Sequence, residues 1–212
     1  MSERPVVVAF DVDGTLTRRD WVVPFLWRLG ATRLVLGLAR RAPSVIAAVA
    51  RRDRDRLKAL ATAAAFHGRS VAAVEQVAAA FGVEIERWLR DDTSGRLSWH
   101  RQQGHTVVLV SASYEVYLDV LGRSLGVDAV LATRVASDGA TYTGALAGDN
   151  CRGAEKLRRL DEWLAAREDV KGGRRGVVLW AYGDSAGDRE LLEAADHPVW
   201  ATTSITSVPS TE

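Results

Sequence analysis

A single cysteine, Cys151, occurs among the 212 residues, which excludes an internal disulfide and a cysteine-rich zinc site. The four histidines, His67, His100, His105 and His197, form no pair with the spacing of metal ligands. Neither sign of charge dominates, because 28 basic and 27 acidic residues give a formal net charge of +1. A strong field that would attract nucleic acid is therefore lacking. These absences indicate a reducing compartment, and we expect a cytoplasmic protein without a nucleic-acid partner.

The chain also lacks a long uninterrupted apolar run. The first run, Val6–Phe10, ends in an aspartate and is too short for the core of a signal peptide, so we expect no such peptide. The most apolar later region, residues 34–50, is interrupted by Arg40, Arg41 and Pro43, and we expect no membrane span there. Burial against neighbouring helices is the expected explanation of this region. A basic amphipathic surface that rests on lipid is the alternative.

The composition, with 47% hydrophobic and 26% charged residues, is that of a globular protein with one good-sized core. Continuous apolar runs predict buried strands, and the stretches between them have helical periodicity. Strands that alternate with helices predict an α/β fold with a doubly wound parallel sheet, a Rossmann-like core. The expected strands are Pro5–Phe10, Thr106–Val110, Ala129–Ala132 and Val177–Tyr182, and the expected helices are Tyr114–Leu125, Gly153–Arg167 and Asp188–Ala194.

The segment between the first two expected strands differs in composition. It is rich in alanine, leucine and arginine, shows helical periodicity and contains no convincing strand. We expect residues 19–100 to form an inserted, all-helical cap of four or five helices, and residues 1–18 and 101–212 to form an α/β catalytic core. A small β-hairpin is expected within Arg134–Leu146, where Asp138-Gly139 is a turn signal. The expected helix breaks are Gly30, Pro43, Arg52-Asp53, Gly68-Arg69-Ser70 and Gly82.

Acidic side chains follow two of the expected strands. Asp11 and Asp13 come directly after the first strand, and Asp184 and Asp188 follow the strand Val177–Tyr182. Sites in open α/β sheets form at the carboxyl ends of strands, so we expect these side chains to converge. Carboxylates crowded in this way repel one another unless a cation lies among them. Oxygen ligands without histidine or cysteine favour Mg²⁺, although a single aspartate in such a turn can instead cap a helix.

Two further residues suit the binding of a phosphate. Ser111 follows the second long strand and offers a hydroxyl group, and Lys156 offers a positive charge in the first turn of an expected helix. A hydroxyl, an ammonium and backbone N–H groups at a helix N-terminus are common phosphate ligands. The pattern therefore predicts a site for a phosphate beside a metal.

These residues resemble, in order and spacing, the four motifs of the haloacid dehalogenase superfamily: Asp11-Val12-Asp13-Gly14-Thr15, Ser111, Lys156 and Gly183-Asp184-Ser185-Ala186-Gly187-Asp188. The resemblance extends from the first strand to about Trp200. The helical insertion after the first motif is similar to the cap of subfamily IB, the branch that contains the phosphoserine phosphatases. The resemblance implies a Mg²⁺-dependent phosphatase that hydrolyses a phosphomonoester through an aspartyl-phosphate.

The resemblance also implies a role for each motif residue. Asp11 is implied to be the nucleophile and Asp13 the general acid and base. The implied phosphate ligands are Ser111, Ala112 and Lys156, the implied metal ligands are Asp11, Asp13 (through its main-chain carbonyl) and Asp184, and Asp188 is implied to hold a metal-bound water or to orient Lys156.

The lysine of the third motif has an alternative. In phosphoserine phosphatases this lysine directly precedes a glycine, which here would select Arg152, the residue before Gly153. We favour Lys156, because a compact ammonium can contact both Asp11 and a phosphate.

The cap residues that would select the substrate are less well defined. In phosphoserine phosphatases a glutamate shortly after the first motif reads the substrate amine. Asp20 falls at the comparable place, but its neighbours differ, and it is equally placed to cap a helix that starts at Trp21. Further candidates for substrate contact are Arg19, Trp21, Arg56 and Lys58. As alternatives, Trp21 also suits the inward face of a helix, and residues 51–56 suit a solvent-exposed helix start.

We expect a small phosphorylated metabolite as substrate, such as a phosphoserine-like compound, a sugar or cyclitol phosphate, or histidinol phosphate. The alternatives are a lipid phosphate at a membrane surface, transfer of the phosphate to another alcohol as in a phosphotransferase or mutase, and a phosphate-binding module without turnover. The presence of Asp11, Asp13, Asp184 and Asp188 together favours an enzyme. The sequence does not define the oligomeric state.

Overall fold

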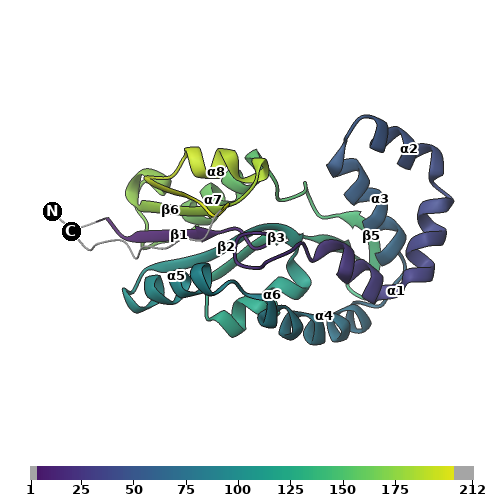
Figure 1. Ribbon diagram of the computed structural model, residues 1–212, viewed down its shortest axis with the longest axis horizontal. Helices are drawn as coiled ribbons and strands as arrows, with labels where there is room; N and C mark the ends of the chain where they lie inside the picture. Colours follow the sequence, from purple (N-terminus) through teal and green to yellow (C-terminus); the bar gives the residue numbers. More distant parts are fainter. Residues whose placement is uncertain (1–3, 203–212) are drawn as a thin grey trace.

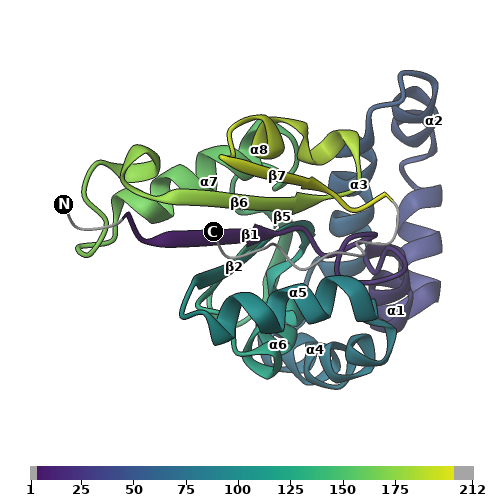
Figure 2. The same cartoon turned by 60° about the vertical axis from the view of Figure 1, so that its left-hand side comes forward.

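The computed structural model describes residues 4–202, so residues 1–3 and 203–212 of the predicted core lie outside the described part. Its five-stranded sheet is parallel throughout, with the order β3-β2-β1-β6-β7 (Figures 1 and 2). The chain adds strands first on one side of the central β1 and later on the other, so the predicted doubly wound α/β fold is confirmed. The strands are β1 (Val6–Phe10), β2 (Thr106–Tyr114), β3 (Ala129–Thr133), β6 (Val178–Gly183) and β7 (His197–Trp200).

Alternate residues of β1 enter cores on opposite faces of the sheet, as the strand period of two requires. Val7 and Ala9 belong to one buried cluster, and Val8 and Phe10 belong to the other. Both faces are covered, which explains why the strand reads as a continuous apolar run. The covering helices are α5 (Asp91–Gln102) and α6 (Glu115–Leu125) on the Phe10 face, and α7 (Ala154–Ala165) and α8 (Arg189–Glu193) on the other, with the short helices η2 (Gly173–Gly176) and η3 (Ala186–Asp188) beside β6 (Figure 2).

The register of the sheet brings the polar strand ends together. Phe10 lies opposite Leu109 of β2 and Tyr182 of β6. The backbone N–H of Asp11 donates to the carbonyl of Tyr182 at 2.9 Å. The residues that follow these strands therefore share one edge of the sheet, as the sequence predicts.

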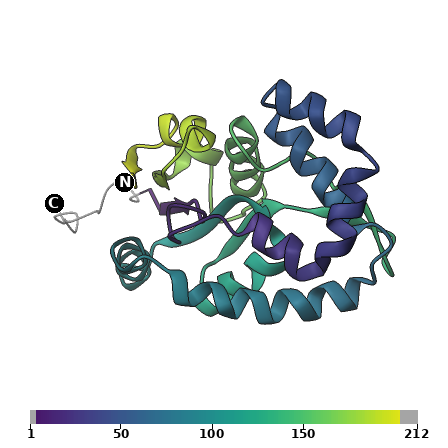
Figure 3. The same cartoon turned by 45° about the vertical axis from the view of Figure 1, so that its right-hand side comes forward.

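The insertion after β1 consists of four α-helices and a short 3-10 helix, and α1–α3 form one end of the molecule (Figures 1 and 3). Several predicted breaks hold. Pro43 lies in the first turn of α2, where a proline costs no helical hydrogen bond. Asp53 caps α3 by accepting from the N–H of Arg56 at 2.8 Å. The elements are α1 (Val22–Ala39), α2 (Ala42–Ala50), α3 (Arg54–Phe66), α4 (Val71–Ile85) and η1 (Glu86–Trp88).

One predicted glycine break is confirmed and one is wrong. Gly30 has non-helical backbone angles, φ 153° and ψ 98°, and two helical segments meet there at a kink within Val22–Ala39. Gly82 lies inside α4, and a Cβ atom there would come within 2.6 Å of the Cβ of Val120 on α6. The glycine therefore permits close approach of two helices, which sequence alone does not distinguish from a helix end.

The predicted hairpin forms from β4 (Val135–Ser137) and β5 (Tyr142–Leu146), which pair antiparallel. It also supports the insertion, because the N–H of Gly68 donates to the carbonyl of Tyr142 at 2.8 Å. In return, the N–H of Tyr142 donates to the carbonyl of Arg69 at 2.8 Å. The segment after β3 thus holds the end of α3.

Other boundaries differ from those expected. Strand β7 was not predicted, because its sequence His-Pro-Val-Trp is short and contains a proline, which sheets tolerate at an edge. Strand β2 continues to Tyr114 rather than ending at Val110. Most of helix α5 lies within the predicted cap range of residues 19–100, yet His100 Nε2 is 2.9 Å from the hydroxyl of Tyr182 in the sheet. The division of the chain at residue 100 stays a prediction.

Replacing Gly82 by alanine should lower the free energy of unfolding by about 1–3 kcal/mol, because the new methyl group forces α4 away from α6. Replacing Gly95 by alanine should raise it by about 0.5–1 kcal/mol, since Gly95 is exposed inside α5 and a methyl group there would meet no atom within 4 Å. Urea unfolding followed by circular dichroism measures both. Equal effects of the two substitutions would contradict the close packing of α4 on α6.

Candidate active site

A cavity of about 630 Å³ lies between the carboxyl ends of the strands and the helices α1 and α3. Charged and polar side chains line its floor, and Val22 and Leu26 of α1 with Leu57 of α3 line its wall. Most of the predicted site residues therefore share one space. The polar lining includes Asp11, Asp13, Asp20, Lys58, Ser111, Ala112, Asn150, Arg152, Lys156, Asp184 and Asp188.

Lys156 is buried between two carboxylates at the centre of the site. Its Nζ lies 2.5 Å from Asp11 Oδ1 and 2.5 Å from Asp188 Oδ1. Burial alone would lower the pKa of the ammonium, but the two carboxylates outweigh this effect and raise that pKa above 10.5. Lys156 therefore keeps its charge at neutral pH. Arg152 lines the same cavity but makes no ion pair with either carboxylate in the described residues.

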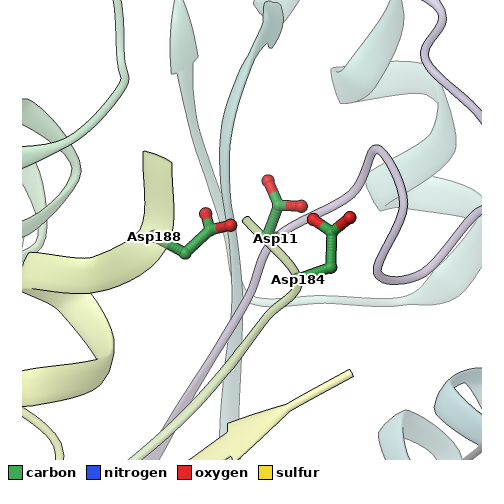
Figure 4. Close-up of side chains that lie close together, drawn as sticks. All are labelled: Asp11, Asp184 and Asp188. Carbon is green, nitrogen blue, oxygen red and sulfur yellow. The ribbon is translucent and has the colours of Figure 1, made fainter. Parts of the chain in front are cut away.

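Asp11, Asp184 and Asp188 form a group of oxygen ligands (Figure 4). One carboxylate oxygen of each lies within 4.8 Å of the others. Burial raises the pKa of Asp11 to about 6, although Lys156 opposes the shift, and burial followed by the charge of Asp188 raises the pKa of Asp184. The three carboxylates are paired with one ammonium, that of Lys156, which contacts Asp11 and Asp188. An oxygen-only donor set with a deficit of positive charge fits a hard divalent cation.

Asp13 is held in a different setting. The N–H of Trp21 donates to its Oδ1 at 3.2 Å, and the hydroxyl of Ser113 donates to its Oδ2. Burial, followed by the charges of Asp20 and Asp11, raises the pKa of Asp13 to about 8. Asp13 therefore carries a proton at neutral pH, whereas its neighbour Asp11 is more easily ionised. Its carboxylate is not part of the group formed by the other three aspartates.

Two residues near the carboxyl end of β2 border the cavity. Ser111 and Ala112 both line it. The hydroxyl of Ser111 accepts a hydrogen bond from the N–H of Ser113 at 3.1 Å, so this N–H already has a partner. The contact of the Ser113 hydroxyl with Asp13 was missed by the sequence analysis. The period of two along an extended strand end places Ser111 and Ser113 on the same side.

The turn after β6 positions Asp184 and Asp188. Asp188 accepts hydrogen bonds from the N–H and the hydroxyl of Ser185, at 3.0 and 2.9 Å, in a reciprocal cap of η3. Gly14 faces Asp184 from the turn after β1, with a φ of +86°. A Cβ atom at Gly14 would lie 2.2 Å from Asp184 Oδ2, so only glycine leaves room for this carboxylate.

Lys58 reaches the cavity from α3. Its Nζ lies 2.6 Å from Asn150 Oδ1 and 3.0 Å from Thr133 Oγ1, and it also donates to the carbonyl of Ala112. No carboxylate among the described residues forms an ion pair with it, and burial lowers its pKa to about 7. Asn150 was missed by sequence reasoning, because only the folded chain brings its loop under α3.

The other substrate candidates are distributed differently. Asp20 lines the cavity and also caps α1, since its Oδ1 accepts from the N–H of Val22 at 2.8 Å. Arg19, Trp21 and Arg56 are not among the residues that line the cavity. The guanidinium of Arg19 lies over the ring of Trp21, which is buried in the core, and the side chain of Arg56 is exposed.

The chain is similar in sequence to known proteins. Protein CicA of Caulobacter vibrioides is 39% identical over 199 residues, which cover 92% of this chain and 86% of the relative. A protein of Mycobacterium tuberculosis named as a probable phosphatase is 38% identical over 98 residues, but these cover 46% of this chain and 32% of that protein.

Solved structures share the fold. A protein of unknown function from Bordetella pertussis Tohama I has a TM-score of 0.73 at 24% identity, over 91% of this chain and 87% of that one. A substrate-bound phosphoserine phosphatase has a TM-score of 0.58 at 16% identity, over 92% of this chain and 84% of that one. The family of haloacid dehalogenase-like hydrolases matches residues 8–193. With this match over most of its length, the chain belongs to the haloacid dehalogenase-like hydrolase family.

Proposed function

We propose that this hydrolase is a Mg²⁺-dependent phosphatase that cleaves a small phosphate monoester through an aspartyl-phosphate on Asp11. The observation that carries the proposal is the setting of Asp11, whose carboxylate lies 2.5 Å from Lys156 Nζ beside Asp184 and Asp188 in the cavity. A nucleophile, a fixed cation and further metal ligands meet at one point. This combination suits attack on phosphorus better than attack on a neutral carbon.

The first step joins Asp11 to the phosphate. A carboxylate oxygen of Asp11 forms a bond to phosphorus while the bond from phosphorus to the leaving oxygen breaks. Asp13 transfers its proton to that oxygen, which leaves as an alcohol. The pKa of about 8 supports this role, because the acid must be protonated before the ester bond breaks.

The second step returns Asp11 to its starting state. Asp13, now a carboxylate, takes a proton from a water molecule whose oxygen attacks the phosphorus of the aspartyl-phosphate. The bond between Asp11 and phosphorus breaks, and inorganic phosphate leaves. Water as the second acceptor agrees with the hydrolase family to which the chain belongs.

Positive charge is needed because a carboxylate and a phosphate repel each other. Two unit charges about 4 Å apart cost on the order of 4 kcal/mol at an effective dielectric constant of about 20. Lys156 offsets part of this cost, with Ser111 and the N–H of Ala112 as further phosphate ligands. Asp11, Asp184 and the main-chain carbonyl of Asp13 would hold Mg²⁺, with Asp188 orienting Lys156. When bound, the ion neutralises charge between the carboxylates and the phosphate oxygens.

The cap side of the cavity supports a role in substrate selection for Lys58 and Asp20. The half-buried ammonium of Lys58 forms no ion pair with an acid among the described residues, and Asp20 lines the same cavity. An anionic group on the substrate would give Lys58 the partner that it lacks. The cytoplasmic location expected from the sequence stays a prediction.

Replacing Asp11 by asparagine should lower the turnover number by at least about a thousandfold, because the amide cannot accept the phosphate. Release of inorganic phosphate from p-nitrophenyl phosphate and from a panel of phosphorylated metabolites measures this loss. The parent, but not the variant, should also form an acid-stable phosphoprotein that hydroxylamine cleaves. Asp91→Asn, at a fully exposed aspartate on α5, is the control and should keep parental turnover. Substantial turnover by Asp11→Asn would overturn the covalent route.

Removing divalent ions should abolish turnover, because the carboxylate group then repels the phosphate ester. Activity is measured after treatment with EDTA and again after the addition of Mg²⁺ in excess, which should restore it. Circular dichroism before and after treatment distinguishes loss of the ion from unfolding. Full turnover in the presence of the chelator would contradict the metal site.

Replacing Lys58 by methionine should raise KM for a substrate with a second anionic group by about tenfold, since a hydrogen bond to a charged group contributes about 1.5 kcal/mol or more. The pKa of Lys58 is about 7, so the parent loses this charge as the pH rises through 7 and its kcat/KM should fall there. The variant should lack that part of the pH profile. Arg56→Met, on the same helix but outside the cavity lining, is the control. Unchanged KM in Lys58→Met would exclude the substrate contact.

A further inference from the structure

Exposed apolar side chains are concentrated on α1 and α2. Within residues 4–202, the large apolar residues that are most exposed include Ile46 at 68% and Val49 at 57%, both on α2. Helix α2 has the sequence Ala-Pro-Ser-Val-Ile-Ala-Ala-Val-Ala, and Ala48 is its only buried residue. The expected burial of this region is therefore wrong for α2. On α1 the exposed apolar residues are Val23, Trp27, Val35 and Leu36, each at 50% or above.

The same surface is rich in arginine; Arg28 pairs with Glu84 of α4, and the other arginines of residues 21–52 form no ion pair among the described residues. Residues 21–52 contain no aspartate or glutamate, although the whole chain is nearly neutral. Arg33 and Arg40 are exposed on and beside α1, between the apolar residues. We call the exposed apolar and basic side chains of α1 and α2 the cap surface. Its arginines are Arg28, Arg33, Arg40, Arg41, Arg51 and Arg52.

Helix α1 is long and apolar enough to cross a membrane by length and composition, and it is the only such helix in the described part of the chain. Its structure fits a surface position better. Its inner face packs into the fold through Phe25, Leu29 and Leu34, which are buried, and Gly30 kinks it. A helix that packs on one side and exposes tryptophan, aliphatic residues and arginine on the other matches an interfacial helix.

We propose that the cap surface docks on an anionic lipid bilayer. Arg33 and Arg40, which form no ion pair among the described residues, complement lipid phosphates, and Trp27 and Ile46 supply apolar area to the boundary between headgroups and chains. A second copy of the chain fits less well, because a two-fold contact would place this basic surface against itself. The cap surface adjoins the cavity wall, since Val23 is exposed and also lines the cavity. Docking therefore brings the cavity next to the bilayer.

Co-sedimentation of the full chain with vesicles tests the proposal without any substrate. The vesicles consist of phosphatidylcholine alone or of an equimolar mixture with phosphatidylglycerol. The parent should bind the mixed vesicles more strongly, and added salt should weaken the binding. Trp27→Glu and the double variant Arg33→Glu with Arg40→Glu should each lose at least about tenfold in partition coefficient.

Matched controls lie elsewhere on the molecule. Trp200→Glu changes a tryptophan of similar exposure, 47%, on the edge strand β7. Lys171→Glu with Arg175→Glu makes the same change in net charge on exposed residues that precede β6, at the other end of the sheet. Both controls should bind vesicles as the parent does. Equal losses in the controls, or no preference for phosphatidylglycerol, would overturn the proposal.

Two further measurements separate the remaining outcomes. Self-association of the parent that Trp27→Glu abolishes, without vesicle binding, would show that a second copy covers the surface and would also overturn the proposal. Hydrolysis of p-nitrophenyl phosphate should be unchanged in all these variants, because none of the substituted residues lines the cavity. Vesicle binding by a chain that hydrolyses no ester would support docking while contradicting the proposed phosphatase.

Discussion

The contact of one buried ammonium with two carboxylates governs how the rest of the site is arranged. Lys156 lies 2.5 Å from both Asp11 and Asp188 and is almost inaccessible to water. Burying an ion is expensive unless its partners are close and well oriented, so these three side chains need fixed supports. The strand end of β1 holds Asp11, the first turn of α7 holds Lys156, and the reciprocal cap with Ser185 holds Asp188. One charge contact thus joins three distant parts of the sequence.

The aspartates and Lys156 could be predicted from the sequence because strand ends obey a simple rule. Parallel strands finish at one edge, so polar residues after apolar runs must meet there. The contacts of Asn150 with Lys58 follow no such rule. They depend on how α3 packs on the loop before α7, and the periodicity of the sequence does not indicate this packing. Arg56 lies outside the cavity for a similar reason, since a small rotation of α3 decides which of its side chains face inward.

Sequence patterns predicted the details of the helical insertion less accurately than those of the sheet. Its helices were expected from composition, and Pro43 and Asp53 mark real helix starts. Gly82 was wrongly predicted to end a helix, because close helix packing and helix termination both favour glycine. Helix α2 was wrongly expected to be buried against other helices, because an apolar sequence indicates only that removal of the helix from water is favourable. The sequence of the helix does not determine whether its apolar side chains contact the rest of the protein, a lipid or a partner.

The paired hydrogen bonds between the end of α3 and β5 have a consequence for motion. Gly68 and Arg69 exchange backbone hydrogen bonds with Tyr142, so the hairpin is fastened to the insertion rather than free beside it. A movement that swings α3 away from the catalytic floor must carry the hairpin with it. The bending then falls on the connections that join the hairpin to β3 and α7, as well as on those at the two ends of the insertion. Such a movement would involve two chain segments together, and it would bend four backbone connections instead of two.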